Sequence, residues 1–264
     1  MERWRGRVAV VTGASAGIGA AIAYQLQDAG LTVVALARRK EKIQEAVAAA
    51  RRGAEGRGRV PIGGKAATQG ALHCLKCDVS REEDVLAAFK WVKDNLGVVH
   101  LLVNNAGVVG EQKLSEVESQ EIKRIMDTNV LGLSICTREA IQLMKEKGVD
   151  DGQIIHIGSI CGHMQCGLFP SAFYYASKHA VRVLLEGLRK ELVAAKSRIR
   201  VMEISPGSVF TEILDDMKII TAEMRFKDPY LWAEDIADIV LYVTSAPPHV
   251  QIHEVIVVPT GETM

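Results

Sequence analysis

Short apolar runs alternate along this chain with longer stretches in which apolar residues recur every three or four positions. The short runs are rich in β-branched residues, which is typical of strands buried on both faces of a parallel sheet. The longer period is that of a helix with one buried face. Strands are expected at 8–11, 31–36, 74–77, 101–103, 154–157, 199–204 and 255–258. Helices are expected after Gly19 and at 40–52, 81–96, 114–147, 172–195 and 233–244.

Strand and helix in regular alternation predict an α/β fold: a single-domain, Rossmann-type, doubly wound parallel sheet with helices on both faces. We expect the whole chain, 1–264, to form one such domain. The stretch 53–70 interrupts the alternation, because it is rich in glycine and basic residues. We expect a long, mobile surface loop there; a basic loop that binds phosphate or a partner is the alternative.

Composition narrows the classes of function. Hydrophobic residues make up 48% of the chain, enough for a large core, and the formal net charge of +0 gives no footprint for nucleic acid or an anionic membrane. The longest apolar stretches have the length of a strand, and neither terminus shows a charged segment followed by an apolar run. We therefore expect a cytoplasmic protein without a membrane span.

The chain has 5 cysteines, an odd number that favours free thiols over a disulfide framework. Cys74 and Cys77 have the spacing of a redox or zinc pair. On a strand, however, residues three apart point to opposite faces, and no second pair of ligands follows at a suitable distance. A structural role is favoured, and no metal site is expected.

The first apolar strand runs directly into a glycine-rich turn, and a helical pattern follows it. Strand, glycine turn and helix in this order are the context of a dinucleotide-binding loop, whose backbone N–H groups bind pyrophosphate. A glycine turn without a nucleotide is the alternative. We expect the cofactor at Gly13, Ser15, Gly17, Ile18 and Gly19.

The end of the second strand indicates which dinucleotide binds. NAD-binding folds usually carry an acidic residue there, which holds the ribose 2′-hydroxyl. Here Ala37 is followed by Arg38 and Arg39, and a guanidinium matches the geometry of a phosphate. The sequence therefore predicts NADP(H), with Arg38 as the better candidate; a solvated start of a helix is the alternative.

Tyr174 and Lys178 are four residues apart in a helical stretch and so share one face. A tyrosine with a pKa of about 10 is a poor base, but a nearby positive charge lowers that pKa. The pair can therefore exchange a proton near neutral pH. A solvated pair on an exposed face is the alternative. Tyr175 is a rival base, but it has no lysine four residues later.

Further motifs follow the expected strands in a consistent order. They are Cys77 to Val79, Asn104 to Gly107, Asn129, Ser159 and Pro206 to Thr211. Together with the glycine turn and the tyrosine–lysine pair, they resemble those of the short-chain dehydrogenase/reductase superfamily. The resemblance covers essentially the whole chain. It implies additional cofactor contacts from Asp78, Val79, Asn105, Ala106, Gly107, Tyr174, Lys178, Pro206, Gly207, Val209 and Thr211.

The same resemblance implies a catalytic set of Asn129, Ser159, Tyr174 and Lys178. Tyr174 exchanges the substrate proton, Ser159 hydrogen-bonds the substrate oxygen, and Lys178 holds the nicotinamide ribose and lowers the pKa of the tyrosine. Asn129, expected at a break in the 114–147 helix, positions a water that links Lys178 to solvent. Taken alone, Ser159 is also compatible with a plain strand-end serine, and Asn129 with a residue that caps or bends a helix.

A closer resemblance is to one animal branch of this superfamily, which contains insect farnesol dehydrogenases and a vertebrate steroid and carbonyl reductase. Four stretches carry it: the first five residues of the chain, and residues 133–140, 150–155 and 254–259. This implies a small lipophilic alcohol or carbonyl substrate, with a farnesol-type alcohol favoured over a steroid or small carbonyl. We expect a substrate lid at 208–232 and an opposite wall at 160–173, where Cys161 and Cys166 give apolar lining.

Two expectations concern assembly and class. The resemblance implies a homodimer or homotetramer formed through the 114–147 and 172–195 helices. The alternative to an enzyme is an interaction module that binds NADP(H) without catalysis. Loss of the serine, tyrosine or lysine is the usual sign of such a module, and this chain retains all three.

Overall fold

The computed structural model describes residues 1–59, 66–163, 171–213 and 229–262. Its centre is a 7-stranded sheet in which every neighbouring pair of strands is parallel. The strand order is β3-β2-β1-β4-β5-β6-β7, so the chain reverses its direction of travel across the sheet between β1 and β4. The strands are β1 (Val8–Thr12), β2 (Thr32–Ala37), β3 (Leu72–Lys76), β4 (Leu101–Asn104), β5 (Gln153–Ile157), β6 (Arg200–Pro206) and β7 (Glu254–Val257).

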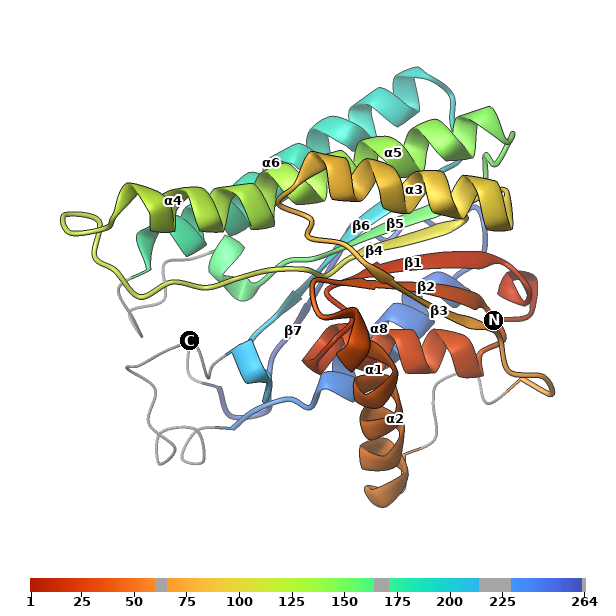
Figure 1. The fold of residues 1–264 in the computed structure, drawn as a ribbon, viewed down its shortest axis with the longest axis horizontal. Helices are drawn as coiled ribbons and strands as arrows, with labels where there is room; N and C mark the ends of the chain where they lie inside the picture. Colours follow the sequence, from red (N-terminus) through yellow and green to blue (C-terminus); the bar gives the residue numbers. More distant parts are fainter. Residues whose placement is uncertain (60–65, 164–170, 214–228, 263–264) are drawn as a thin grey trace.

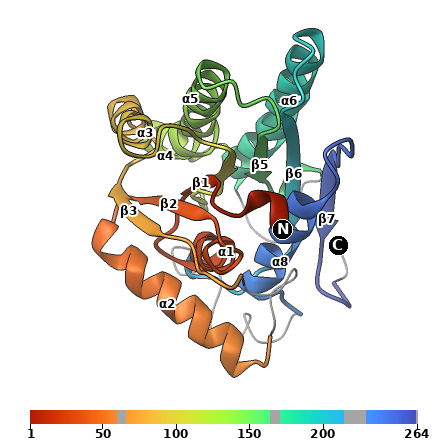
Figure 2. The same cartoon turned by 90° about the vertical axis from the view of Figure 1, so that its right-hand side faces the viewer.

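Helices cover both faces of the sheet (Figure 1). On one face lie α1 (Gly17–Asp28), α2 (Lys40–Gly56) and α8 (Ala233–Ser245). On the other lie α3 (Glu82–Leu96), α4 (Ser119–Met126), α5 (Leu133–Glu146) and α6 (Ala172–Ala194). Figure 2 shows the same two layers with β3 and β7 at the two edges of the sheet. The α/β doubly wound parallel fold expected from the sequence is confirmed.

The alternation of side chains along β1 explains why its whole run is apolar. Ala9 and Val11 pack in the core beneath α1 and α8, whereas Val8 and Val10 pack in the core beneath α3 and α5. Successive strand residues point to opposite faces, and a strand covered on both sides must be apolar throughout. Burial of these two faces from water is the main driving force for this arrangement.

Two expected boundaries are wrong. The helix expected from residue 114 begins at Ser119, because the Gln112 side chain accepts the Glu118 backbone N–H at 2.8 Å and the chain turns before entering the helix. The loop expected from Gly53 begins only after Gly56. Helix α2 continues to that residue because Ala54, in its last turn, is fully buried in the core.

The described part of the expected 53–70 loop is held against the rest of the fold. Arg57 pairs with Glu234 at 2.5 Å, and Arg59 pairs with Asp235. The backbone N–H of Gly70 donates to the Gln27 carbonyl at 2.9 Å. These two arginines are committed to α8, which argues against the alternative of a phosphate-binding loop here. Residues 60–65 lie outside the described part of the chain.

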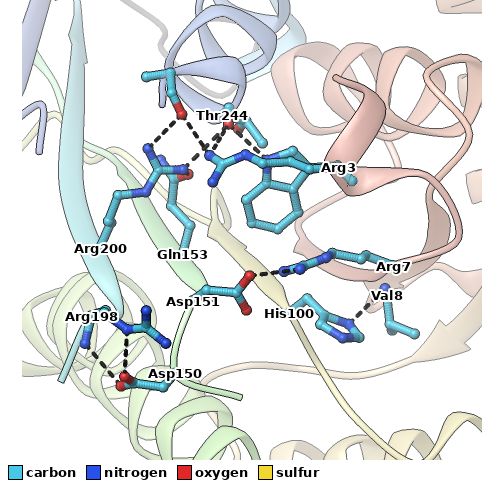
Figure 3. Close-up of polar contacts among 12 residues, drawn as sticks. Arg3, Arg7, Val8, His100, Asp150, Asp151, Gln153, Arg198, Arg200 and Thr244 are labelled. Atoms are coloured by element: carbon cyan, nitrogen blue, oxygen red, sulfur yellow. Dashed lines mark hydrogen bonds and ion pairs between the residues drawn. The ribbon is translucent and has the colours of Figure 1, made fainter. Parts of the chain in front are cut away.

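Polar side chains tie the amino ends of the strands together (Figure 3). A short 3-10 helix, η1 (Glu2–Trp4), lies there, and Trp4 Nε1 donates to the Thr244 carbonyl at 2.8 Å. Arg200 on β6 donates to the same carbonyl at 3.3 Å and to Ala246 O at 3.2 Å. The chain start and the end of α8 are thereby fixed at one end of the sheet, and the opposite, carboxyl end carries the candidate site.

Candidate active site

The glycine turn between β1 and α1 packs directly on the backbone that follows β4. Gly13 has a φ of +67°, a left-handed conformation that favours glycine. A Cβ atom on Gly19 would lie 2.4 Å from the Gly13 carbonyl oxygen and 2.5 Å from Asn105 Nδ2. No larger residue fits at that position without displacing the turn. This close packing of helix on strand is what a dinucleotide-binding turn requires.

The N-terminus of α1 suits an anion. Its N-cap is Ala16, which has no side chain able to accept the free N–H groups, and its first turn contains no acidic residue. The unsatisfied N–H groups and the positive end of the helix dipole therefore favour a phosphate. Ser15 and Ile18 flank this end and are partly exposed. The residues present fit the pyrophosphate of a dinucleotide.

Thr12 joins the ends of β1 and β4, where the sheet reverses its order. Its Oγ1 accepts the backbone N–H groups of Asn105 and Ala106, each at 3.0 Å. Asn105 Nδ2 donates back to Thr12 O at 2.9 Å. The Asn105 side chain thus supports the glycine turn, and the crevice at this reversal is where ligands bind in open α/β sheets.

The ends of β2 and β3 lie beside this turn. The backbone N–H of Cys77 donates to Ala37 O at 3.0 Å, so the residues after both strands are neighbours. Arg38 and Arg39 follow Ala37 and are exposed. Arg39 Nη2 lies 3.9 Å from a carboxylate oxygen of Glu212. Both arginines therefore follow β2 at the carboxyl edge of the sheet, as expected from the sequence.

Asp78 and Val79 form the turn from β3 to α3. Asp78 Oδ1 accepts the backbone N–H of Ser80 at 3.1 Å and its hydroxyl at 2.7 Å. Val79 is buried, and a Cβ atom on Gly132 would lie 2.4 Å from its carbonyl oxygen. This turn is thus fixed against the segment that carries Asn129.

Lys178 reaches from α6 to the carboxyl end of β5. Its Nζ donates to Ile157 O at 3.0 Å and lies 5.7 Å from the centre of the Tyr174 ring. The shared helical face predicted for the pair is confirmed. Burial lowers the pKa of Lys178 to about 8, and the charge of Glu203 opposes that shift. A Cβ atom on Gly107 would lie 3.9 Å from Nζ, so the ammonium also borders the turn after β4.

Ser159 and Tyr174 lie close to this lysine in the fold. Ser159 follows β5, is 8% exposed, and its Oγ accepts the backbone N–H of Cys161 at 3.1 Å. Tyr174 is partly exposed and packs against Cys161 and Tyr175, whereas Tyr175 is only 5% exposed. Of the two tyrosines, Tyr174 is the more accessible to a substrate.

Asn129 lies in a π-helical segment, η2 (Asp127–Gly132), between α4 and α5. The expected break in the long helix is therefore confirmed. Its Oδ1 accepts the backbone N–H of Val108 at 2.8 Å, and its Nδ2 donates to Val108 O at 2.9 Å and to Ser177 Oγ at 3.0 Å. Ser177 Oγ in turn donates to Tyr174 O at 2.7 Å. The Asn129 side chain thereby connects the turn after β4 to the helix of the tyrosine and lysine.

The segment after β6 closes the other side of the crevice. Gly207 N donates to Val257 O at 2.8 Å, and a Cβ atom on Gly17 would lie 3.1 Å from Thr211 Cγ2. Val209 forms a bridge with Leu231, so the two ends of the expected 208–232 lid meet at its base. Pro206 ends β6 at the same edge. Residues 214–228 lie outside the described part.

Comparison with known proteins decides the family. The profile of the short chain dehydrogenases matches residues 7–219. The chain belongs to the short-chain dehydrogenase/reductase family. It is 45% identical over 263 residues to a farnesol dehydrogenase of Aedes aegypti, covering 99% of both chains. It is 43% identical over 266 residues to dehydrogenase/reductase SDR family member 11 of Bos taurus, again covering 99% of both.

A solved structure supports the same assignment. The closed form of a serine dehydrogenase complexed with NADP⁺ superposes with a TM-score of 0.82 at 26% identity, covering 97% of this chain and 96% of that one. The resemblance inferred from the motifs is therefore confirmed at the level of family and fold. As a member of the family, the chain is an oxidoreductase.

The described cysteines of this short-chain dehydrogenase are free thiols that are buried or partly buried. Cys74 packs against the core beneath α1, whereas Cys77 is buried in the core beneath α3, so the two thiols point to opposite faces. Burial raises the pKa of the Cys77 thiol to about 12. The described residues contain no group of ligands that could hold a metal ion. Cys161 is buried beside Tyr175, and Cys166 lies outside the described residues.

Sequence reasoning missed two polar residues of the site. Thr12 is the last residue of an apolar strand, and its hydroxyl is the strand's only polar side-chain group; that contrast is the available signal. Glu203 is a carboxylate within buried β6, 1% exposed, and its charge acts on Lys178. An acidic residue flanked by Met202 and Ile204 in a strand expected to be buried was the corresponding signal.

None of the described helices is both long enough and apolar enough to cross a membrane.

Proposed function

We propose that this protein is an NADP(H)-dependent oxidoreductase that interconverts a lipophilic alcohol and its aldehyde or ketone. The observation that carries the proposal is the position of Lys178, whose Nζ reaches the Ile157 carbonyl two residues before Ser159 and lies beside the Tyr174 ring and Gly107. A non-catalytic module has no need of this arrangement.

The cofactor assignment rests on charge and on backbone geometry. The glycine turn and the uncapped N-terminus of α1 suit the pyrophosphate, and the exposed Arg38 and Arg39 after β2 are proposed to bind the 2′-phosphate of NADP(H). The closed serine dehydrogenase of similar fold binds NADP⁺, which supports the same choice. Further contacts are proposed from the turns after β3, β4 and β6, at Asp78, Val79, Asn105, Ala106, Gly107, Pro206, Gly207, Val209 and Thr211.

Nicotinamide, when bound, supplies the hydride chemistry; the protein supplies the proton chemistry. In alcohol oxidation, the deprotonated Tyr174 takes the proton from the substrate hydroxyl. Ser159 donates a hydrogen bond to the substrate oxygen and stabilises the negative charge that develops there. Lys178 remains positive, which favours the deprotonated form of the tyrosine. Reduction of a carbonyl uses the same groups in the reverse order.

Asn129 has a supporting role in this proposal. Its amide group is hydrogen-bonded to Val108 and Ser177, and so it holds the helix of Tyr174 against the turn after β4. We propose that the π-helical segment also orders a water that links Lys178 to solvent. The fixed position of the segment keeps the tyrosine and the lysine in register with the cofactor crevice.

Substrate class is inferred from the relatives and from the apolar character of the surrounding segments. Because the chain is similar to a farnesol dehydrogenase of Aedes aegypti, a terpenoid alcohol is the favoured substrate class. Phe210 lies at the base of the proposed lid, in contact with the rings of Tyr230 and Trp232. Most other expected lining residues lie in 164–170 and 214–228, outside the described part. We propose farnesol as the first substrate to test, ahead of steroid and small carbonyl compounds.

Assembly is proposed to be a homodimer or homotetramer through the 114–147 and 172–195 segments, which form α4, η2, α5 and α6. Val183 and Val193 on α6 are 72% and 71% exposed, and Leu184 is 42% exposed. Val183 and Leu184 are neighbours on α6, and exposed apolar side chains that lie together are typical of a surface that another protein covers.

The test combines turnover with cofactor binding. Purified protein is incubated with NADP⁺ and farnesol, or with a panel of alcohols and ketones, and the absorbance of reduced nicotinamide is followed. Tyr174→Phe should lower kcat by about 10²- to 10⁴-fold, because the proton acceptor is lost, and leave the Kd for NADP⁺ nearly unchanged. Tyr175→Phe is the matched control and should retain activity.

Two results would count against the proposal. An active Tyr174→Phe variant would remove the tyrosine from its role. Tight NADP⁺ binding without turnover of any member of the panel would instead favour the non-catalytic module.

A further inference from the structure

Glu203 carries a carboxylate directly behind the candidate active site. It lies on β6, is 1% exposed, and pairs in register with His156 of β5. A Cβ atom on Gly158 would lie 1.8 Å from its Oε1, so the carboxylate packs against the backbone immediately before Ser159. Val201, two residues earlier, points to the α6 side of the sheet, and Glu203 therefore faces α6 as well.

Lys178 is a charged group that α6 presents to this carboxylate, and it is the positive charge on which the proposed chemistry depends. Burial lowers the pKa of Lys178 to about 8, and Glu203 is the largest influence that raises it again. In the other direction, burial followed by the charge of Glu254 raises the pKa of Glu203 to about 7, while Lys178 and Arg182 lower it. The two groups therefore stabilise each other's charged forms across the end of β5.

Other polar groups extend from Glu203 toward the edge of the sheet. Ser205 Oγ lies 3.3 Å from Glu203 Oε1 and 2.9 Å from Glu254 Oε1 on β7. His163 Nε2 is 2.5 Å from the same Glu254 oxygen, and Arg182 Nη2 is 3.7 Å from the other. The carboxylate thus belongs to a connected polar cluster and not to an isolated buried charge.

A cavity of about 350 Å³ borders this cluster and is lined by residues of α6, β6 and the start of β7. Its lining includes Glu203, Glu254, Arg182, Arg189 and the exposed Val183. The remaining titratable groups on its wall are Glu186 and His253, and Cys161 also faces Lys178. One side of the Glu203 carboxylate therefore faces a cavity that reaches the surface, and its other side faces the lysine.

We propose that Glu203 is a positioning residue for the reaction, one that holds Lys178 in its ammonium form from behind the sheet. The proposal rests on the function proposed above, because it acts through Lys178. The carboxylate does not touch substrate or cofactor. It adds the negative charge that a buried ammonium needs in order to stay protonated near neutral pH, and the cavity lets the carboxylate exchange protons with solvent.

The sign of the expected effect follows from the charges. Removing the carboxylate in Glu203→Gln removes the main influence that raises the pKa of Lys178, so that pKa falls further. Alcohol oxidation needs a positive Lys178 beside a deprotonated Tyr174, and the alkaline limb of the pH profile reports loss of the lysine proton. The alkaline limb of kcat should therefore move to lower pH by about one unit, which is about tenfold in rate above that limb.

The experiment reads the lysine directly as well as through turnover. The pKa of Lys178 is followed by NMR of protein labelled at the lysine ε-carbons, with Lys178→Met used to assign the signal. It should be lower in Glu203→Gln than in the wild type, and close to wild type in Glu203→Asp, which keeps the charge. Glu186→Gln, which removes a carboxylate from the outer wall of the same cavity, is the matched control and should leave both readouts unchanged.

Folding is measured in parallel. Because the folded state disfavours the charged form of Glu203, Glu203→Gln should be at least as stable as the wild type above pH 7. A purely structural role would instead lower the melting temperature and leave the pKa of Lys178 in place.

An unshifted lysine signal in a folded Glu203→Gln protein would overturn the proposal. Because the NMR readout does not need turnover, it remains decisive even if no alcohol or ketone is converted, and failure of the proposed function would be recognised separately.

Discussion

At the scale of single residues, the four-residue spacing of the tyrosine–lysine pair predicts their shared helical face but not the groups that surround the lysine. Four residues on a helix place Tyr174 and Lys178 on one face, and the structure has them there. The partner that fixes the ammonium is the carbonyl of Ile157, and the charge that opposes its deprotonation is Glu203. Ile157 lies on β5 and Glu203 on β6, whereas the lysine lies on α6. Their proximity depends on how β5, β6 and α6 pack, which no local spacing encodes.

The proposed preference for NADP(H) can also be tested at single side chains. Arg38→Asp should shift the ratio of kcat/KM for NADP⁺ to that for NAD⁺ toward NAD⁺ by about 10- to 100-fold. A charge-assisted hydrogen bond to the 2′-phosphate, worth about 1.5–3 kcal/mol, is lost and a repelling carboxylate is introduced. Steady-state kinetics with both cofactors provide the measurement.

Lys40→Asp is the matched control for charge, since Lys40 begins α2 one turn away from the strand end. It should change the ratio less than Arg38→Asp does. An unchanged preference in Arg38→Asp would remove this arginine from the phosphate site. Arg39 already has Glu212 as a neighbour, and so its contribution should be the smaller of the two.

At the scale of elements, strands and helices were predictable where burial is uniform along the element. The seven expected runs correspond to the seven strands; the inner strands are covered on both faces, whereas the edge strands β3 and β7 are partly exposed. The ends of helices were less predictable. The extension of α2 to Gly56 depends on Ala54 packing into the core, and the two arginines that follow are fixed by carboxylates of α8. These contacts join segments far apart in the sequence.

The π-helical segment is an element with a testable packing requirement. A Cβ atom on Gly132 would lie 2.4 Å from the Val79 carbonyl oxygen. Gly132→Ala should therefore destabilise the protein by about 1–3 kcal/mol, the usual cost of overpacking, and weaken NADP⁺ binding by displacing the turn after β3. Urea unfolding and a binding titration measure the two effects.

Gly187→Ala gives the opposite expectation in a matched glycine. Gly187 is exposed in the interior of α6, and a Cβ atom there meets nothing within 4 Å. Alanine should stabilise the helix by about 0.5–1 kcal/mol and leave cofactor binding unchanged. If the two variants had equal stabilities, the contact between Gly132 and Val79 would not constrain the fold.

At the scale of the whole molecule, the two ends of the sheet have separate tasks. The amino end is held by hydrogen bonds from Trp4 and Arg200 to the Thr244 carbonyl of α8, a network that anchors the start of the chain (Figure 3). The carboxyl end carries the uncapped N-terminus of α1 and the Tyr174–Lys178 pair, which are proposed to bind ligands. Motifs at strand ends predicted this division, because the ends of parallel strands must meet at one edge. The stabilising network was not predicted, since its members are scattered along the sequence.

Two buried groups, His156 and Glu203, have opposite effects on how the free energy of unfolding changes with pH in mild acid. Burial lowers the pKa of His156 to about 3, so the folded state keeps this ring neutral while the unfolded chain protonates it near pH 6.5. Its contribution to stability is present above pH 6.5 and is lost as the pH falls. The pKa of Glu203 is raised to about 7, so its contribution is full below its unfolded pKa near 4.5 and is lost as the pH rises through 7.

Between pH 5 and 6.5 the two groups change the free energy of unfolding in opposite directions. Each contributes a slope of about 1.4 kcal/mol per pH unit when its protonation differs fully between the folded and unfolded states. Glu203→Gln should therefore lose unfolding free energy as the pH falls across this window, more steeply than the wild type. His156→Gln should change in the opposite sense relative to the wild type, and exposed His249→Gln should follow the wild type. Urea unfolding at several pH values measures the slopes, and parallel slopes in all four proteins would show that neither buried group is held away from its ordinary titration.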